Sequence, residues 1–117
     1  MKLAEVHVDD TDETPVVHIR GEIDASNADV VRNEVVAVIP RDAPGAVIDL
    51  STTTYLDSSG IRLLFDLAER LQARRQRLAL VVTEEALVRR VLVLTKLEDA
   101  VPLHQDITSA LQAVATR

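Results

Sequence analysis

Runs of hydrophobic residues at strand spacing mark four stretches of this chain. Residues 3–8 alternate, with aliphatic side chains on one side and charged or polar ones on the other, which is typical of a half-buried strand. Strand character resumes at 16–20 after an acidic turn over 9–15, so these two strands are predicted to form an antiparallel hairpin. The continuous apolar runs 46–50 and 78–82 predict strands that are covered on both faces.

Four other segments show the hydrophobic spacing of amphipathic helices. The first follows Gly21-Glu22-Ile23-Asp24, which we expect to turn the chain, and Ser26 with Asp29 fits a capping box at its start. The second helix begins at Ile61, and the last begins at Asp106. The side chains expected to be buried are, helix by helix, Ala28, Val31, Val35, Val38 and Ile39; Ile61, Leu64, Phe65, Ala68 and Leu71; Leu87, Val88, Val91, Leu92 and Leu94; and Ile107, Ala110, Leu111 and Val114.

Charged and polar residues add detail to the second and third of these helices. Thr83 is expected to cap the third helix, and Glu84 and Glu85 suit the positive end of its dipole. On the outer face of the second helix, Asp66 is spaced to pair with arginines four residues before and after it. These carboxylates are therefore interpreted as helix-stabilising groups, not as an acid–base pair for catalysis.

The order of the elements predicts an α/β fold. The second helix lies between the apolar strands 46–50 and 78–82, so strand, helix and strand are expected to form a right-handed parallel crossover. A short fifth strand is expected at 100–103. The prediction is one domain over residues 1–117, with a mixed sheet of four to five strands and four helices.

The composition removes several classes of function. The chain has no cysteine, so disulfides, thiolate metal ligands and a cysteine nucleophile are excluded. Tyr55 and Phe65 are its only Phe, Tyr or Trp residues, and together with the formal net charge of −6 this argues against direct binding of nucleic acid. No apolar run approaches the about 20 residues that span a bilayer, and no secretory signal is visible, so we expect a cytoplasmic protein.

The stretch with the strongest candidate chemistry is Asp57-Ser58-Ser59-Gly60, between the strand 46–50 and the helix that begins at Ile61. A polar turn at the start of a helix exposes unpaired backbone N–H groups and the positive end of the helix dipole. Two hydroxyl groups at such a place either cap the helix or mark a site where an anion is attached or bound.

Other catalytic chemistry finds little support in the sequence. Ser58 does not lie in a G-x-S-x-G nucleophile elbow, and the three glycines are too widely spaced for a phosphate-binding loop. The histidines His7, His18 and His104 fall on predicted strands or strand ends, where a structural role is expected. We therefore expect no enzyme activity, no cofactor and no metal ion.

A response-regulator receiver domain is an alternative interpretation of the acidic residues. Asp9 and Asp10 follow the first strand, Asp49 or Asp57 lies near the third, and Lys96 comes late in the chain. A receiver gathers such groups around Mg²⁺ and phosphorylates one aspartate. It needs a helix directly after the first strand, however, and here a second, antiparallel strand follows. The acidic turn would then lie away from a shared metal site.

Several segments of the chain form a pattern that is shared with a known family. They are Gly21-Glu22-Ile23-Asp24, Val47-Ile48-Asp49-Leu50, Tyr55-Leu56-Asp57-Ser58-Ser59-Gly60-Ile61, Val88-Arg89-Arg90-Val91-Leu92, Leu97 and Ala100-Val101-Pro102-Leu103. Together they resemble a STAS domain, in particular the anti-sigma factor antagonist family. The resemblance covers nearly the whole chain, and the sequence Asp57-Ser58-Ser59-Gly60 is its most specific part. The chain departs from the family pattern at Lys96, and at Gln76 or Arg77, where the family often has glycine.

The resemblance implies a protein that regulates by switching partners. The unmodified antagonist would bind a serine-kinase anti-sigma factor, phosphorylation of Ser58 would release it, and a phosphoserine phosphatase would reset the cycle. The resemblance places the binding surface at Asp24, Asp57, Ser58, Ser59 and Gly60, on a protein expected to be a monomer that contacts neither nucleic acid nor membrane. A second possibility within the family is a docking or scaffold subunit of a stress-signalling complex, in which the serine turn only caps a helix.

Two arguments disagree about which serine would carry the phosphate. The centre of the apolar stripe on the second helix lies almost opposite Ser59, so periodicity alone predicts that Ser59 is the exposed serine. The family resemblance chooses Ser58. A helical wheel does not describe a residue that is the N-cap or precedes it, and we expect Ser58 to be such a residue. The prediction is therefore Ser58 as acceptor, with Ser59 in a supporting role in the first turn.

Overall fold

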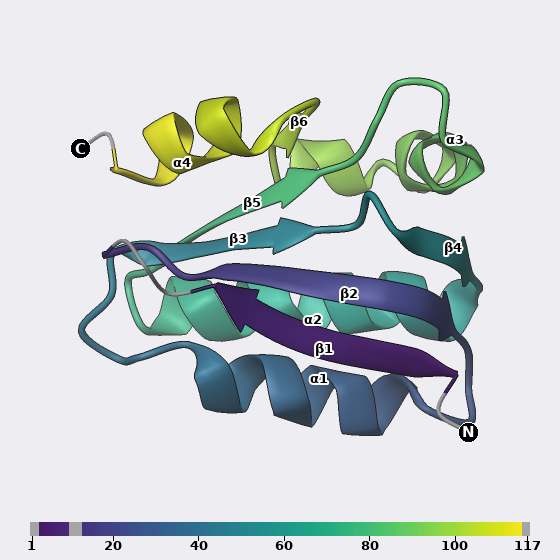
Figure 1. Ribbon diagram of the computed structural model, residues 1–117, viewed down its shortest axis with the longest axis horizontal. Helices are drawn as coiled ribbons and strands as arrows, with labels where there is room; N and C mark the ends of the chain where they lie inside the picture. The colour runs from purple at the N-terminus through teal and green to yellow at the C-terminus, as the bar shows by residue number, and fades with distance from the viewer. Residues whose placement is uncertain (1–2, 10–12, 116–117) are drawn as a thin grey trace.

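The computed structural model describes residues 3–9 and 13–115 and has the predicted α/β architecture (Figure 1). In the described part of the chain, no helix is both long enough and apolar enough to cross a membrane. The elements, in chain order, are β1 (Ala4–Asp9), β2 (Val16–Ile23), α1 (Ala28–Val38), β3 (Gly45–Asp49), β4 (Thr53–Leu56), α2 (Ser58–Ala73), β5 (Arg77–Val81), α3 (Leu87–Leu94), the 3-10 helix η1 (Leu97–Asp99), β6 (Leu103–His104) and α4 (Ile107–Ala115).

The strands form one mixed sheet of six, in the order β1-β2-β3-β5-β6, with β4 beside the second half of β2. β1 pairs antiparallel with β2, and the other pairs are parallel, which confirms both the hairpin and the crossover. β4 was not predicted. It has four residues, and only the first and last of them are buried, so its sequence carries neither alternation nor a continuous apolar run.

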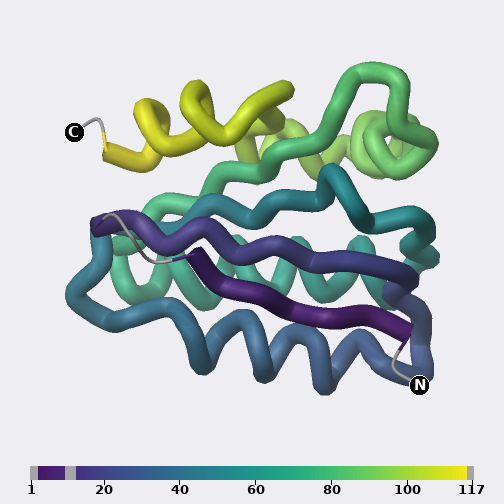
Figure 2. Tube along the Cα trace, in the orientation of Figure 1, coloured from purple at the N-terminus to yellow at the C-terminus, as the bar shows by residue number. Residues whose placement is uncertain are grey.

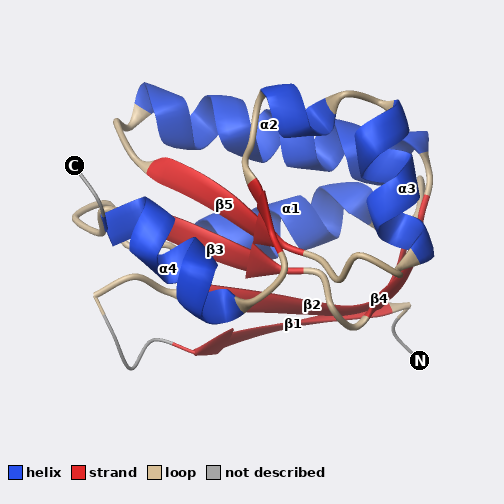
Figure 3. Ribbon diagram, turned by 90° about the horizontal axis from the view of Figure 1, so that it is seen from above, coloured by secondary structure: helices blue, strands red, loops and turns tan. Residues whose placement is uncertain are grey.

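Helices cover the two faces of the sheet unequally. α1 and α2 lie together on one face, α4 lies on the other, and α3 lies beside β4 (Figures 1 and 3). Alternate residues of β3 and β5 divide between the two cores, as strand geometry requires. Ala46, Ile48, Leu78 and Leu80 join the core under α1 and α2, whereas Val47, Ala79 and Val81 join the smaller one under α4.

The two ends of the described chain lie at opposite ends of the sheet (Figure 2). We call the end at which β2 and β4 finish the carboxyl edge, and the end at which β3 and β5 begin the amino edge. The chain enters near the carboxyl edge, where the carbonyl of Leu3 accepts a hydrogen bond from the N–H of Glu22 at 2.9 Å. It leaves near the amino edge, where Arg77 Nη1 donates to the carbonyl of Ala113 at 3.3 Å.

The connection into α1 differs from the prediction. No turn occurs at 21–24, because β2 continues to Ile23. Gly21 has a φ of 108° where the pairing of β2 with β4 shifts register, a left-handed conformation that glycine adopts readily. The capping box of Ser26 and Asp29 is also wrong: Asn27 is the N-cap of α1, and Ser26 donates instead to the carboxylate two residues before it.

The central helix is longer than predicted and buries a different set of residues. α2 begins at Ser58, three residues before the predicted start at Ile61. Phe65 and Ala68 are only half-buried, because they face a groove beside β5 (described below). The buried residues of α2 are Gly60, Ile61, Leu63, Leu64, Leu67 and Leu71.

The third helix buries fewer side chains than its sequence suggests. Thr83 does not cap it; α3 begins at Leu87, and Thr83, Glu84 and Glu85 precede it in a turn. Six of its eight residues are aliphatic, which is more than one face of a short helix can bury. Leu87 and Leu94, both predicted to be buried, are therefore 74% and 75% exposed. Only Val88 and Leu92 are buried.

The last strand and helix follow the prediction with a small shift. β6 lies at Leu103–His104, slightly later than the predicted strand at 100–103, and pairs with β5. α4 begins at Ile107, one residue after the predicted start at Asp106, and Asp106 Oδ1 accepts a hydrogen bond from the N–H of Ser109 at 2.7 Å. This bond, helped by the Ser109 hydroxyl, holds the pKa of Asp106 below its ordinary value.

Two non-glycine residues end helices in the left-handed conformation. Arg75 has a φ of 60° in the turn after α2, where its N–H donates to the carbonyl of Gln72 at 2.9 Å. The N–H of Gln76 donates to the carbonyl of Leu71 at 2.8 Å, and the two bonds form a Schellman motif. The left-handed residue is thus Arg75, not Gln76 or Arg77 as the family pattern suggested. Lys96, with a φ of 61°, does occupy such a position.

Replacing Lys96 with glycine is expected to raise the free energy of unfolding. A left-handed residue with a Cβ costs about 1–2 kcal/mol, and the greater freedom of glycine in the unfolded chain returns about 0.4–1 kcal/mol of that. The expected gain is about 0.5–1 kcal/mol, measured by urea denaturation. Lys96→Ala is the matched control, since it removes the same charge and keeps the Cβ. Equal stability of the two variants would contradict this explanation.

Candidate functional site

The predicted site residues lie at the carboxyl edge of the sheet. Ile23 and Leu56 pair as the last residues of the parallel strands β2 and β4. Asp24 and Asp57 follow them directly, and the N–H of Asp57 donates to the carbonyl of Ile23 at 3.3 Å. The two carboxylates therefore belong to neighbouring loops at one end of the molecule, the right-hand end in Figure 1.

Asp57 caps the helix that carries the serines. Its Oδ1 accepts hydrogen bonds from the N–H groups of Ser59, at 2.8 Å, and Gly60, at 3.3 Å. The expectation that Ser58 is the N-cap or precedes it is therefore wrong, because Asp57 takes that position and Ser58 is the first residue of α2. Ser58 is exposed, and no residue in the described ranges hydrogen-bonds its hydroxyl. Its hydroxyl is thus left free at the start of the helix.

Ser59 has a different environment from Ser58. It lies in the first turn of α2 and is half-buried, on the wall of a groove of about 200 Å³ between α1 and α2. Arg32 and Asp66 line the same groove, and Arg32 Nη1 lies 3.7 Å from Asp66 Oδ2. Asp66 thus pairs across to α1, not along α2 as predicted. The helical wheel, which made Ser59 the exposed serine, is likewise wrong.

Gly60 allows the start of α2 to lie directly on the ends of two strands. A Cβ placed on this residue would come within 2.6 Å of the Cβ of Leu56 and 3.5 Å of that of Ile23. The first of these contacts is far too short, so any side chain would push the first turn of α2 away from the sheet. Gly60 therefore sets the position of Ser58 by packing.

Asp24 is held in place by the residues that follow it. Its Oδ1 accepts hydrogen bonds from the hydroxyl of Ser26 and, at 2.8 Å, from the N–H of Ser26. Its own N–H donates to Asn27 Oδ1 at 2.9 Å. The Ser26 hydroxyl, followed by its N–H, lowers the pKa of Asp24 below the ordinary value of 3.8. Asp24 is therefore ionised at neutral pH, and it adds a fixed negative charge to this edge.

Exposed apolar side chains next to this edge were not predicted as part of the site. Tyr55, on β4, is 49% exposed, and α3, which carries the exposed Leu87 and Leu94, packs against β4. Two features of the sequence point to these side chains. Aromatic residues are scarce, which makes an exposed tyrosine unusual, and α3 has more aliphatic residues than one face of a short helix can bury. Together they give the carboxyl edge an apolar margin suited to contact with another protein.

The acidic residues do not assemble a receiver site. Asp9 pairs with Val16 at the start of β2, whereas Asp57 follows a strand that pairs with the end of β2. Asp10 lies outside the described residues, and Asp49 Oδ2 is occupied by His18 Nδ1 at 2.7 Å. Within residues 3–9 and 13–115, no three acidic or histidine side chains are grouped so that they could hold a metal ion.

His7 and His18 make structural contacts. His7 and His18 are cross-strand partners in β1 and β2, and their rings stack with centroids 6.0 Å apart. Asp49, which binds His18, also accepts a hydrogen bond from the N–H of Ser51 at 3.0 Å. His104 is in β6. All three lie on strands, as predicted, and none is near Ser58 in the chain.

Comparison with known proteins agrees with the motif and the fold. The model of the STAS domain family matches residues 5–110. The structure of an anti-sigma factor antagonist from Mycobacterium paratuberculosis is 33% identical, with a TM-score of 0.85 over 97% of this chain and 95% of that one. No curated protein sequence matches the chain.

Two structures of one more distant protein are also similar. The anti-sigma factor antagonist SpoIIAA in its unphosphorylated form is 18% identical, with a TM-score of 0.73 over 97% of this chain and 99% of that one. The Bacillus cell fate determinant SpoIIAA in its phosphorylated form is 19% identical, with a TM-score of 0.64 over 94% and 99%. Anti-sigma factor antagonists are non-catalytic regulatory proteins, in line with the expectation that this chain is not an enzyme. The sequence, the fold and the match over residues 5–110 show that this chain belongs to the STAS domain family.

Proposed function

We propose that this protein is an anti-sigma factor antagonist that binds its anti-sigma factor until Ser58 is phosphorylated. The observation that carries the proposal is the free, exposed hydroxyl of Ser58 at the first position of α2, next to the N-cap Asp57. The similarity to SpoIIAA, a protein with structures in unphosphorylated and phosphorylated forms, supports a switch of this kind.

The electrostatics of the site favour a phosphate in the free protein and oppose it in a complex. Phosphorylation adds about −1.5 to −2 charges and three acceptor oxygens. In the free protein, the positive end of α2 stabilises such a charge by about 0.3–1 kcal/mol, and water solvates the rest. In a complex that covers Ser58, the phosphate would lose this water beside the carboxylate of Asp57, and nearby Asp24 adds a second negative charge. Desolvation and repulsion would then cost several kcal/mol.

The resemblance to the anti-sigma factor antagonists supports a proposal for the kind of partner. The partner is a serine-kinase anti-sigma factor that contacts the carboxyl edge through Asp24, Asp57, Ser58 and Ser59, and a phosphoserine phosphatase restores the binding form. The exposed Tyr55 and the leucines of α3 supply apolar contact area next to the switch. The protein acts in the cytoplasm as a monomer and contacts neither nucleic acid nor membrane.

A scaffold role, in which the serine turn only caps the helix, fits the site less well. Among the described residues, Asp57 accepts the hydrogen bonds from the N–H groups of the first turn of α2. The Ser58 hydroxyl therefore does not cap the helix, and capping does not explain why a serine occupies this position.

A phosphorylation experiment with two matched variants tests the proposal. Ser58→Ala and Ser59→Ala are each incubated with the cognate kinase and ATP, and the phosphate is located by mass spectrometry. We expect acid-stable phosphate at Ser58 in the Ser59→Ala protein and none in the Ser58→Ala protein. Full phosphorylation of Ser58→Ala at Ser59 would overturn the assignment. Acid-labile phosphate on an aspartate would favour a receiver, and the absence of modification by any kinase of the host would favour the scaffold.

A further inference from the structure

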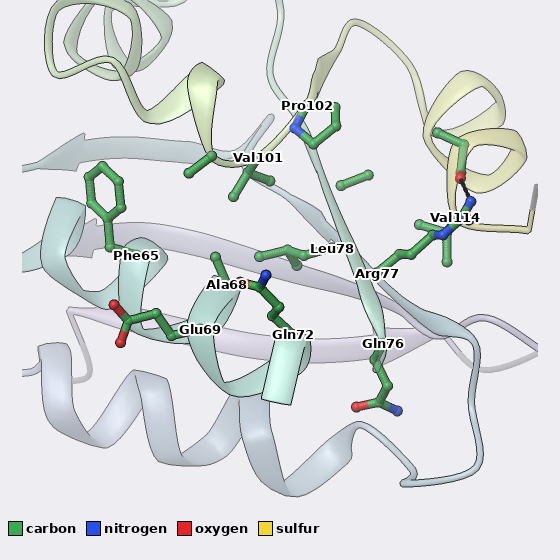
Figure 4. A pocket seen from close by; sticks show the side chains of 13 residues that line it. Phe65, Ala68, Glu69, Gln72, Gln76, Arg77, Leu78, Val101, Pro102 and Val114 are labelled. Atoms are coloured by element: carbon green, nitrogen blue, oxygen red, sulfur yellow. Dashed lines mark hydrogen bonds between the residues drawn. The ribbon is translucent and has the colours of Figure 1, made fainter. Parts of the chain in front are cut away.

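A second surface lies at the amino edge, away from Ser58. It is a groove of about 630 Å³ along β5, lined by Arg77, Leu78 and Ala79 (Figure 4). Because successive side chains of a strand point to opposite faces of the sheet, three consecutive residues line one groove only if it runs along the edge of the strand. The groove thus exposes the backbone of β5 as well as its side chains.

The backbone pairing explains why this edge is open. The N–H groups of Leu80 and Val82 donate to the carbonyls of Pro102, at 3.1 Å, and His104, at 2.9 Å, so alternate residues of β5 direct their polar groups toward β6. The N–H and C=O of Leu78 point to this same side of β5, but the pairing of β5 with β6 begins only at Leu80. Continuing the ladder would require residue 102 to donate to the carbonyl of Leu78. Residue 102 is proline, which has no N–H, so the ladder stops.

Apolar side chains flank this edge from both helical layers. Phe65 and Ala68 reach the groove from α2 on one face of the sheet, and Val114 reaches it from α4 on the other (Figure 4). Arg77 Nη1 donates to the carbonyl of Ala113, which ties α4 to the same end of β5. A strand lying in the groove would therefore meet apolar side chains from both helical layers, with the polar Glu69 and Gln72 of α2 beside them.

We propose that the groove binds an extended segment of a partner protein, which adds to the sheet as a strand beside β5. The backbone of that segment pairs with the N–H and C=O of Leu78, and its successive aliphatic side chains point alternately to Phe65 and Ala68 and to Val114. A peptide is the ligand that offers a donor, an acceptor and alternating apolar groups at strand spacing. No residue of the Asp57–Gly60 turn lines this groove, so the proposal does not depend on the phosphorylation switch.

Titration with short blocked peptides tests this directly. The probes are acetylated and amidated pentapeptides whose three central residues are varied among Ala, Val, Leu and Ile, added to the ¹⁵N-labelled full chain. We expect shifts of the Leu78 and Ala79 amides and, at saturation, exchange of the Leu78 N–H slowed by about tenfold or more. N-methylation of each peptide amide in turn should reveal one position, the donor to Leu78, at which binding weakens by about tenfold or more.

Two variants of the same helix provide the matched control. Ala68→Phe fills the groove from α2 and is expected to weaken peptide binding by about tenfold or more, whereas Ala73→Phe, at an exposed position outside the groove, should leave it unchanged. The amide spectrum verifies that both are folded. The proposal is overturned if no peptide of the set perturbs Leu78, or if N-methylation at every position is without effect. Protection of Leu78 that rises with protein concentration alone would also overturn it, in favour of a second copy of this chain.

Discussion

Replacing Ser58 with aspartate is expected to weaken binding of the anti-sigma factor by about a hundredfold or more, whereas alanine should leave the affinity within about threefold. The alanine variant loses only a hydroxyl that no described residue hydrogen-bonds, and Asp57 still caps α2. The aspartate variant places a charge beside the carboxylate of Asp57, with Asp24 on the neighbouring loop. A charge buried without a partner at an interface costs several kcal/mol, which is a large fraction of a typical binding energy.

Calorimetric titration of the anti-sigma factor into each variant measures this effect. Thr108→Asp is the charge-matched control, because it adds the same charge at an exposed position in the first turn of α4, a helix that packs on β3, β5 and β6. It should bind like the unmodified protein. Equal affinities of Ser58→Asp and Ser58→Ala would remove the switch mechanism and leave the scaffold as the better description.

Leu64→Ala is expected to destabilise the protein more than Phe65→Ala does. Leu64 is completely buried between α2 and the sheet, so its truncation leaves a cavity and should cost about 3–5 kcal/mol. Full burial of Phe65 would predict a loss of similar size. Phe65 is half-buried beside the groove at β5, however, and we expect its truncation to cost about 1–2 kcal/mol.

Urea denaturation of the two variants gives both free energies of unfolding. The neighbouring positions have the same local helical structure, and the larger side chain is the one expected to cost less, so the comparison tests the difference in burial. A larger loss in Phe65→Ala than in Leu64→Ala would show that the face of α2 that contacts the core is assigned wrongly.

Local pattern was enough to find most of the elements but not all of them. β3 and β5 are central strands covered on both faces, so their sequences are continuously apolar and were recognised. β4 is held by its parallel pairing with β2, more than 30 positions earlier in the chain, and such non-local pairing leaves no mark in the four residues themselves. The exposed leucines of α3 were misassigned for a related reason, since the sequence does not reveal how little surface is available to cover them.

In the candidate site, too, the local sequence identified the segment, whereas packing between distant segments decided its details. The sequence identified the Asp57–Gly60 turn and both serines, but Asp57 and Ser58 are equally good N-cap residues, and only packing decides between them. The position of Gly60 against Leu56 fixes the start of α2, so that Asp57 becomes the cap. The helical wheel misjudged Ser59 because it considers only the apolar stripe facing the sheet, whereas α2 also packs against α1, which covers that serine.

The described chain begins at one edge of the sheet and ends at the other. The choice of terminus for attachment to a sensor chip therefore decides which of the two surfaces stays accessible. A tether or fluorophore placed after Ala115 lies at the end of the molecule where Arg77 contacts Ala113, beside the groove along β5. It leaves the Ser58 end open to an anti-sigma factor. A tether placed before Ala4 obstructs the Ser58 end and leaves the groove along β5 open, because the chain there lies next to Glu22, two residues before Asp24. Immobilisation through the two ends should therefore inhibit the two binding reactions separately.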